Sequence, residues 1–567
     1  MEIKDLSFVA PGAGVWMTDG EHTPRPVTPM TAAAFVEMDA GMRLGAERYG
    51  WLLDGMQVAS INRFLYYGMR SLIARRPGDD EASQAAYNAQ MAANPVFQQR
   101  IKSSEAALAS KRWLADAEHW DNVGRPWVMG ITLDLTDVQV QGLDDEGLCL
   151  HLDQVRFHLG SVNAYHHILN PISNNARGML FLRLHEWAEI PAAEVESLLI
   201  GSSPISAGDE PELRTVCQAL KDDGGALGLL DAVDGKTDAD PSAALAALMD
   251  RDGAVGKAAR AYVRMTGYRT VVGWEAMEPY NLEVPENLLA TIRYGLAGEY
   301  AKVDPAAIAG VRDRVPGAHR DEFDVLLGEA RALGRIRDER DLYCNVPVSG
   351  LLRRAVLEAG RRARERGLVD DVEHMTECAQ HEIHGLLKEG KGPSAGELRD
   401  RHIYRQSYTV ADIPAMIGEG DMLAGIPTRW LPAAMQTFQR MQISQRGLDA
   451  GPPDAETETG QTSALRGLGA SPGQYEGVAR VLMSADQLAA IEPGEVLVTL
   501  STNPAFNIVM AKIGALVTEH GGRLSHSAIV AREFGLPAVV GVRGATVKIA
   551  TGDQLRVDAD KGEVTVL

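Results

Sequence analysis

The chain has 567 residues, of which 45% are hydrophobic and 23% charged, so its composition is that of a globular protein with two to four domains. Its formal net charge of −21 argues against nucleic-acid and anionic-membrane partners, because both attract positive charge. No apolar run approaches the roughly 18 residues of a membrane span, and the start of the chain lacks the pattern of a signal peptide. The cysteines form no CxxC pair and no metal-ligand spacing, so we expect reduced thiols in a cytoplasmic protein: they are Cys149, Cys217, Cys344 and Cys378.

The first 120 residues alternate extended and helical patterns. A proline-rich stretch around His22 cannot be helical and is typical of an extended strap. Apolar positions recur at helical spacing from Met30 to Leu53, and β-branched and aromatic residues over Gln57–Tyr67 predict a strand. Helix formers then dominate Gln84–Asp121.

A β-hairpin and a pair of histidines come next. Trp127–Val140 and Leu148–Phe157 alternate well enough to predict two strands, with a turn at Asp144–Gly147. Because neighbouring residues of a helix point to different sides, His166 and His167 do not form a metal pair as they stand. One of them could line a substrate pocket or be an ordinary core or surface histidine, and the sequence leaves both readings open.

Two arginines in the middle of the chain are candidates for binding an anion. Arg269 could grip a phosphoryl group with both arms of its guanidinium, or form a salt bridge with a nearby carboxylate. Arg320–Leu387 has a long amphipathic helical pattern, in which Arg354 could hold an anion or belong to a charged helix face.

The composition changes at Asp449–Gly469, which is rich in Pro, Gly, Thr and acidic residues and predicts a flexible linker. A coil of that length spans about 25 Å on average and stretches beyond about 60 Å. Such a reach suits a domain that visits two separated sites.

The last hundred residues place a histidine at the start of a helix. The predicted order is a strand, a glycine loop, a helix capped by Ser525 and a second strand. The ranges are Ile513–Thr518, Gly521–Gly522, His526–Phe534 and Ala538–Val540. The helix N-terminus disfavours a charged imidazole at His526 and attracts an anion, which suits a histidine that accepts and donates a phosphoryl group. A histidine that only packs or caps the helix is the alternative.

Residues Gly469–Leu567 resemble the swivelling phosphohistidine domain of the phosphoenolpyruvate-utilising enzymes. The matching pieces are Ala470–Gly473, Gly477–Arg480, Gly494–Val498, Gly521–His526, Ala531–Gly541, Gly552–Asp553 and Val557–Asp558. The resemblance implies that His526 is phosphorylated. It also implies that the phosphate is positioned by its neighbours Gly521, Gly522, Arg523 and Ser525.

Earlier segments resemble the helical substrate domain of the phenylphosphate-synthase-like and rifampin-phosphotransferase-like members of this family. They are the proline-rich start, Thr266–Asn287 and Leu352–Thr376. The resemblance implies a multidomain protein: a mainly helical substrate domain with some β-structure (1–448), a linker (449–469) and an α/β phosphohistidine domain (470–567). Candidate substrate-domain residues are His22, His166, Arg269, Arg354 and His374, and His374 departs from the aromatic residue that the family pattern leads us to expect.

No phosphate-binding loop of the GxxxxGK[ST] type occurs, and nothing resembles the family's ATP-grasp module. We therefore expect a separate ATP-grasp subunit that transfers a phosphoryl group from ATP to His526 with Mg²⁺, and an acceptor hydroxyl on a phenolic compound. Three alternatives remain: a carrier that relays the group to another protein, a subunit of an antibiotic phosphotransferase, and a regulator that keeps only the fold.

Overall fold

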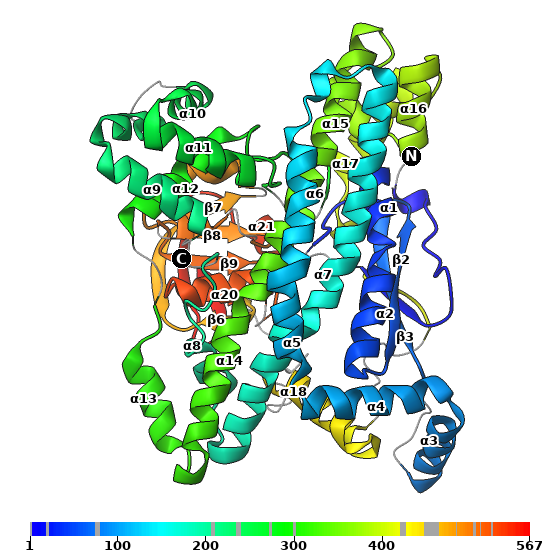
Figure 1. Ribbon diagram of the computed structural model, residues 1–567, viewed down its shortest axis with the longest axis vertical. Coiled ribbons are helices and arrows are strands. Elements are labelled where there is room, and N and C mark those ends of the chain that lie inside the picture. Colours follow the sequence, from blue (N-terminus) through cyan, green and yellow to red (C-terminus); the bar gives the residue numbers. More distant parts are fainter. Residues whose placement is uncertain are drawn as a thin grey trace. The chain divides into compact units, whose positions relative to one another are not determined.

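The computed structural model describes residues 3–18, 22–73, 80–205, 210–233, 240–271, 275–298, 302–419, 427–446, 464–482, 485–502, 506–510, 512–522 and 525–567. The chain forms two compact units, which we describe separately (Figure 1). Unit 1 comprises Met1–Met179, Trp274–Glu278 and Glu339–Gln442, and unit 2 comprises Leu180–Gly273, Pro279–Asp338 and Ile443–Leu567. Three of the five boundaries fall inside helices α7 (Asp145–Ala188), α14 (Arg320–Glu339) and α18 (Ala433–Arg446), and the other two flank Trp274–Glu278.

Unit 1 is mainly helical and contains a four-stranded antiparallel sheet in the order β2-β3-β1-β4. Besides parts of α7 and α18, its helices are α1 (Pro29–Phe35), α2 (Met38–Tyr49), α3 (Glu81–Ala93), α4 (Pro95–Ala109), α5 (Arg112–His119), α6 (Arg125–Asp137), α15 (Val346–Glu365), α16 (Gln380–Glu389) and α17 (Ala395–Ser407). Its strands are β1 (Val15–Thr18), β2 (Leu53–Ile61), β3 (Phe64–Ser71) and β4 (Met416–Gly418). Shorter 3₁₀ and π segments connect several of these elements.

The hairpin predicted at Trp127–Val140 and Leu148–Phe157 is wrong, because these residues lie almost wholly in α6 and α7. The buried positions of α6 recur at helical spacing, at Val128, Thr132 and Leu135. At the predicted turn, the Asp144 carboxylate accepts a hydrogen bond from the backbone N–H of Gly147 (2.7 Å) and so caps the start of α7. A short sequence with acidic residues and glycine can form a hairpin turn or cap the start of a helix.

The predicted strand over Gln57–Tyr67 is two strands. It breaks between β2 and β3, which pair as an antiparallel hairpin. The two loop residues, Asn62 and Arg63, have φ values of 49° and 70°, the left-handed conformation that a two-residue hairpin loop requires. The helical predictions over Met30–Leu53 and Gln84–Asp121 are confirmed in large part by α1 to α5.

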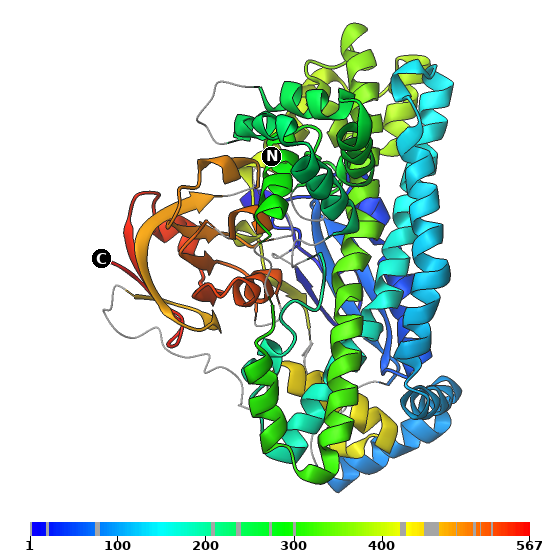
Figure 2. The ribbon, with the colours of Figure 1, turned by 60° about the vertical axis from the view of Figure 1, so that its left-hand side comes forward.

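Unit 2 combines a group of helices with an eight-stranded sheet in the order β5-β12-β11-β7-β8-β9-β10-β6. The strands of this sheet are the orange to red arrows of Figure 2. Besides parts of α7, α14 and α18, the helices of unit 2 are α8 (Ala192–Ser197), α9 (Pro211–Asp222), α10 (Pro241–Asp250), α11 (Gly253–Thr266), α12 (Pro285–Ala297), α13 (Pro305–Arg314), α19 (Asn507–Met510), α20 (His526–Glu533) and α21 (Ala545–Lys548). Its strands are β5 (Ala464–Arg466), β6 (Leu468–Ser471), β7 (Gln474–Leu482), β8 (Val496–Thr499), β9 (Ala515–Thr518), β10 (Ala538–Val540), β11 (Gln554–Asp558) and β12 (Glu563–Val566).

The sheet has an apolar core on each face, because successive side chains of a strand point to opposite sides. In β8, Val496 and Val498 join one core, whereas Leu497 joins the other. Val271 and Val284 pack into the second core although they lie outside the predicted C-terminal domain. The two units therefore do not coincide with the predicted domains 1–448 and 470–567.

The predicted linker over Asp449–Gly469 extends too far. Residues 449–463 lie outside the described part of the chain, but β5 and the start of β6 occupy most of 464–469. Arg466 pairs with Glu563 in β12, and Gly469 pairs with Val539 in β10. Small residues are typical of flexible segments, but at Gly469 a small residue lets two backbones approach closely.

The elements around His526 are confirmed. β9 ends at Thr518, α20 begins at His526 and β10 starts at Ala538. The fold class, a mainly helical N-terminal region with a C-terminal domain that contains the eight-stranded sheet, is confirmed as well. In the described part of the chain no helix has both the length and the apolar character needed to cross a membrane.

The position of Gly469 gives a test of the corrected boundary. A Cβ at this residue would lie 2.0 Å from the carbonyl oxygen of Ala559, so Gly469→Ala must displace a backbone. We expect this variant to lose about 1–3 kcal/mol in its free energy of unfolding, measured by urea denaturation. Gly328→Ala is the control, since no described atom lies within 4 Å of a Cβ on that helical glycine. The control should be neutral or more stable by about 0.5–1 kcal/mol, and equal stability of Gly469→Ala would support a flexible linker there.

Candidate active site at His526

His526 is the first residue of α20, at the carboxyl ends of the parallel strands β8 and β9. Ser525 is the N-cap of α20, and its Oγ accepts a hydrogen bond from the backbone N–H of Ala528 (3.3 Å). The N–H groups of a first helical turn have no carbonyl partner within their helix and carry a partial positive charge. The carboxyl end of a parallel sheet and the N-terminus of a helix are both common places for anions, and here they coincide.

The loop before α20 depends on a glycine at position 521. Gly521 has a φ of 114°, and a Cβ there would lie 2.8 Å from Oγ of Ser525. The carbonyl oxygen of Gly522 accepts a hydrogen bond from the N–H of Ser525 (3.0 Å), which turns the chain into the helix. Arg523 lies outside the described residues, so its predicted role in positioning a phosphate stays a prediction.

A hydrogen bond between Thr502 and His526 defines how His526 can react. Oγ1 of Thr502 lies 3.0 Å from Nδ1 of His526, and the same hydroxyl lies 2.9 Å from Oγ of Ser527 and can donate to it. The backbone N–H of Thr502 also donates to Oγ of Ser527 (3.0 Å). If the Thr502 hydroxyl donates to Ser527, it accepts from Nδ1–H, which leaves the lone pair on Nε2 of His526. Nε2 is therefore the nitrogen that this network leaves for chemistry.

Sequence reasoning missed Thr502 and Ser527. Thr502 comes three residues after β8, and Ser527 directly follows His526. Polar residues just beyond a buried strand are the signal that could have identified Thr502, but that signal does not say which histidine it meets.

The site keeps His526 neutral. Burial lowers the pKa of His526 to about 4; the negative charge of Asp338 opposes this shift and the positive charge of Arg337 adds to it. The side chain nevertheless retains some exposed surface. At neutral pH the imidazole is therefore uncharged and nucleophilic, and a phosphoryl group on Nε2 would carry its charge beside the first turn of α20.

In unit 1 the structure brings together two of the predicted candidates, His22 and His166. Nδ1 of His166 lies 3.3 Å from the carbonyl oxygen of Arg340 and 3.3 Å from Oδ1 of Asp341. Burial is the largest cause that lowers the pKa of His166, and the charges of Arg340, His167 and His22 lower it further. Arg340 and Asp341 belong to a π-helical segment (Arg340–Asn345) between α14 and α15, an irregularity that is frequent at functional sites.

The histidines of this cluster are not arranged as a metal site. The rings of His166 and His167 are 4.8 Å apart between centroids. In the part of the chain that the structure describes, no group of three or more His, Cys, Asp or Glu residues is placed to hold a metal ion.

Arg269 and Arg354 do not join His22 and His166. In unit 2, Nη1 of Arg269 donates to both carboxylate oxygens of Glu210 (3.0 Å each), the salt bridge that is the alternative to anion binding. In unit 1, Arg354 donates to the carbonyl oxygens of Leu135 and Thr136 (2.8 and 2.9 Å) and so satisfies the end of α6. Both guanidinium groups therefore make structural contacts. To bind a ligand, each would first have to break these hydrogen bonds.

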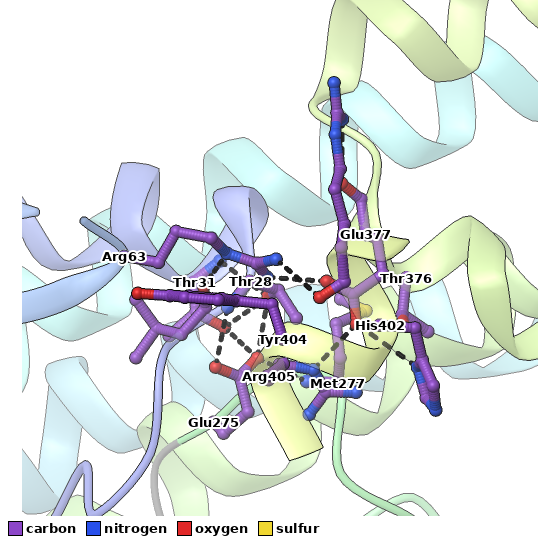
Figure 3. Close-up of polar contacts among 12 residues, drawn as sticks. Thr28, Thr31, Arg63, Glu275, Met277, Thr376, Glu377, His402, Tyr404 and Arg405 are labelled. Carbon is purple, nitrogen blue, oxygen red and sulfur yellow. Dashed lines mark hydrogen bonds and ion pairs between the residues drawn. The ribbon is translucent and has the colours of Figure 1, made fainter. Parts of the chain in front are cut away.

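The predicted candidate His374 contacts His402, which borders a buried charge cluster in unit 1. Figure 3 shows His402 and this cluster. The ring of His374 is 5.3 Å from that of His402, and Nδ1 of His402 is 3.3 Å from Oε1 of Glu377. Glu377, fully buried, accepts hydrogen bonds from Nε of Arg405 (2.8 Å) and Nη2 of Arg63 (2.5 Å). Sequence reasoning missed Glu377 and Arg405.

The tautomer of His526 can be tested directly. In the full chain, ¹⁵N and ¹³C NMR of the imidazole should show the proton on Nδ1 and no protonation of the ring between pH 8 and about pH 5, because the pKa of His526 is about 4. Thr502→Val should produce a mixture of the two tautomers, since Nδ1 loses its partner. Thr551→Val, which removes a hydroxyl that accepts from the N–H of Val481, is the control and should leave the His526 signals unchanged. A ring that titrates near pH 6.5 in the wild type would contradict this site.

Comparison with known proteins agrees with the geometry around His526. Residues 491–562 match the family described as "PEP-utilising enzyme, mobile domain". Over 100 residues the chain is 48% identical to a probable phosphoenolpyruvate synthase of Pyrococcus abyssi, a match that covers 18% of this chain and 12% of that protein.

Longer and weaker similarities extend into the rest of the chain. The uncharacterized phosphotransferase YvkC of Bacillus subtilis is 26% identical over 319 residues, covering 54% of this chain and 36% of that protein. The rifampicin phosphotransferase of Streptomyces sviceus is 27% identical over 293 residues, covering 46% of this chain and 30% of that protein. The matches thus span about a third or less of these relatives. His526 lies within the segment 491–562 that matches the mobile domain of the PEP-utilising enzymes.

Proposed function

We propose that this chain is the substrate-binding and phosphohistidine-carrying part of an ATP-dependent phosphotransferase. The observation that carries the proposal is the state of His526: an uncharged imidazole, held through Nδ1, with Nε2 at the start of a helix inside a PEP-utilising mobile domain. The similarity to a phosphotransferase and a rifampicin phosphotransferase supports the same class of reaction. The acceptor is a hydroxyl group. On the basis of the family resemblance, we propose that it belongs to a phenolic compound.

The reaction proceeds in two half-reactions. In the first, the lone pair on Nε2 of His526 attacks the β-phosphorus of ATP; a P–N bond forms, the bond to the α-phosphate oxygen breaks, and AMP is released. Water later removes the γ-phosphate as inorganic phosphate. In the second, the acceptor oxygen attacks the phosphorus on Nε2, the P–N bond breaks and its electron pair returns to the imidazole. Mg²⁺ accompanies the nucleotide and neutralises phosphate charge.

The nucleotide belongs, in this proposal, to a separate ATP-grasp subunit in the cytoplasm. Two observations support it. The sequence contains no GxxxxGK[ST] loop, and no segment of it resembles the family's ATP-grasp module.

The phosphorylated residue can be identified by labelling. With its ATP-binding partner and ATP labelled in the β-phosphate, the chain should take up acid-labile, base-stable phosphate, and His526→Ala should take up none. His381→Ala is a matched control, because His381 is exposed on α16, and it should label like the wild type. Label retained in His526→Ala would exclude His526 as the carrier. Transfer of the label to another protein, with none to a panel of phenols, would favour the phosphocarrier alternative.

The need for a partner can be tested by thermal unfolding. A ligand that binds only the folded protein must raise its Tm. We expect the purified chain to neither hydrolyse ATP nor shift in Tm with millimolar Mg-ATP. A clear rise in Tm would locate a nucleotide site on this chain and remove the reason for a separate subunit.

A further inference from the structure

In the segment Glu275–Glu278 of unit 1, hydrogen bonds hold Glu275 and Met277, both labelled in Figure 3. The carboxylate of Glu275 accepts hydrogen bonds from Thr28 (Oγ1 2.6 Å, N 3.0 Å) and from Oγ1 of Thr31 (2.5 Å) at the start of α1. Nη1 of Arg353 donates to the carbonyl oxygen of Met277 (2.8 Å). The backbone that leads into Glu278 is therefore fixed, as a positioned functional group requires.

The carboxylate of Glu278 has no such partner. Among the described residues it accepts no hydrogen bond; its ion-pair contact is with Nη1 of Arg405 at 3.6 Å, and 29% of its side chain is exposed. Glu377, in the same cluster, is fully buried and takes hydrogen bonds from Arg405 and Arg63. Of these two carboxylates, only that of Glu278 is both positioned and able to reach another molecule.

The two carboxylates also differ in acidity. Burial raises the pKa of Glu278; Arg405, Arg353 and Arg25 oppose the rise, the negative charge of Glu275 adds to it, and the net shift is upward. Burial also acts to raise the pKa of Glu377, but its ion pairs with Arg405 and Arg63 bring it below the ordinary value. Neighbouring carboxylates whose environments separate their pKa values in this way are typical of one structural and one catalytic group.

We propose that Glu278 is the general base of the acceptor site. The proposal rests on the function proposed above and names the residue that acts on the acceptor in the second half-reaction. As the acceptor oxygen bonds to the phosphorus carried by His526, the hydroxyl proton passes to the Glu278 carboxylate. The P–Nε2 bond breaks, the imidazole is left neutral with its proton on Nδ1, and Glu278 later releases its proton to solvent.

Another candidate base in unit 1 is His166. A general base must come within hydrogen-bond reach of the proton that it removes. His166 is 1% exposed, and its Nδ1 faces Asp341 and the carbonyl of Arg340. With 29% of its side chain exposed, Glu278 is accessible to another molecule, whereas His166 is not.

The test separates the two half-reactions. Wild type and Glu278→Gln are charged with labelled ATP and the partner subunit, freed of nucleotide, and mixed with phenol; phosphohistidine loss and phenyl phosphate are followed. We expect equal charging and equal Tm, but transfer slower by about 10²–10³-fold in Glu278→Gln. The wild-type transfer rate should fall by about tenfold per pH unit below the pKa of Glu278, whereas Glu278→Gln should show no such dependence. Glu278→Asp should recover part of the rate.

Two controls distinguish a catalytic role from a structural one. Glu389→Gln removes an exposed carboxylate of α16 and should transfer at the wild-type rate. Glu377→Gln disrupts the buried ion pairs and should lower the Tm, unlike Glu278→Gln. Transfer by Glu278→Gln at the wild-type rate would overturn the assignment.

A second readout does not depend on the acceptor. Difference infrared spectroscopy should show, in the wild type, a protonated carboxyl group that titrates above pH 4.5 and is missing in Glu278→Gln. If the wild type fails to be charged or phenol fails to discharge it, the proposed function or its acceptor class is wrong, and this titration still decides about Glu278. Absence of such a titrating group would overturn the assignment of Glu278 alone.

Discussion

The hydrogen bond between Thr502 and Nδ1 of His526 decides which ring nitrogen can react. With the proton held on Nδ1, Nε2 keeps its lone pair, and burial prevents that lone pair from being protonated at neutral pH. The C-terminal sheet positions the residues of this contact. Because β8 and β9 are parallel, Thr502 and the glycine loop lie at the same edge of the sheet, and Gly521 allows the chain to turn into α20.

Unit 1, in contrast, contains charged side chains that are wholly or partly buried. There, three carboxylates, Glu275, Glu278 and Glu377, share one region with several arginines, and two of the three are fully engaged in hydrogen bonds. Taking a charge out of water costs several kcal/mol unless partners replace the lost hydration. Glu278 remains partly exposed and accepts no hydrogen bond from the described residues. This arrangement does not favour stability, but it suits a group that contacts a substrate.

The sequence predicts the neighbourhood of His526 well because its elements are short, local and punctuated by glycine, serine and proline. It fails where a pattern has two physical meanings. The acidic turn before α7 is also a helix cap, and the glycine at position 469 is a close backbone contact within a strand. Contacts between residues that are distant in the chain could not be predicted either: 314 residues separate Arg63 from Glu377, and 218 separate Arg354 from Thr136. A single sequence does not reveal which arginine meets a carboxylate and which meets a carbonyl.

The strand order of the C-terminal sheet begins with β5 and ends with β6, yet only Gly467 separates these two strands in the chain. The segment 464–471 therefore pairs with β12 through β5 and with β10 through β6, so one short stretch of chain covers both ends of the sheet order. Without this segment β12 and β10 would both be edge strands, so its pairing leaves fewer backbone groups free to recruit a foreign strand.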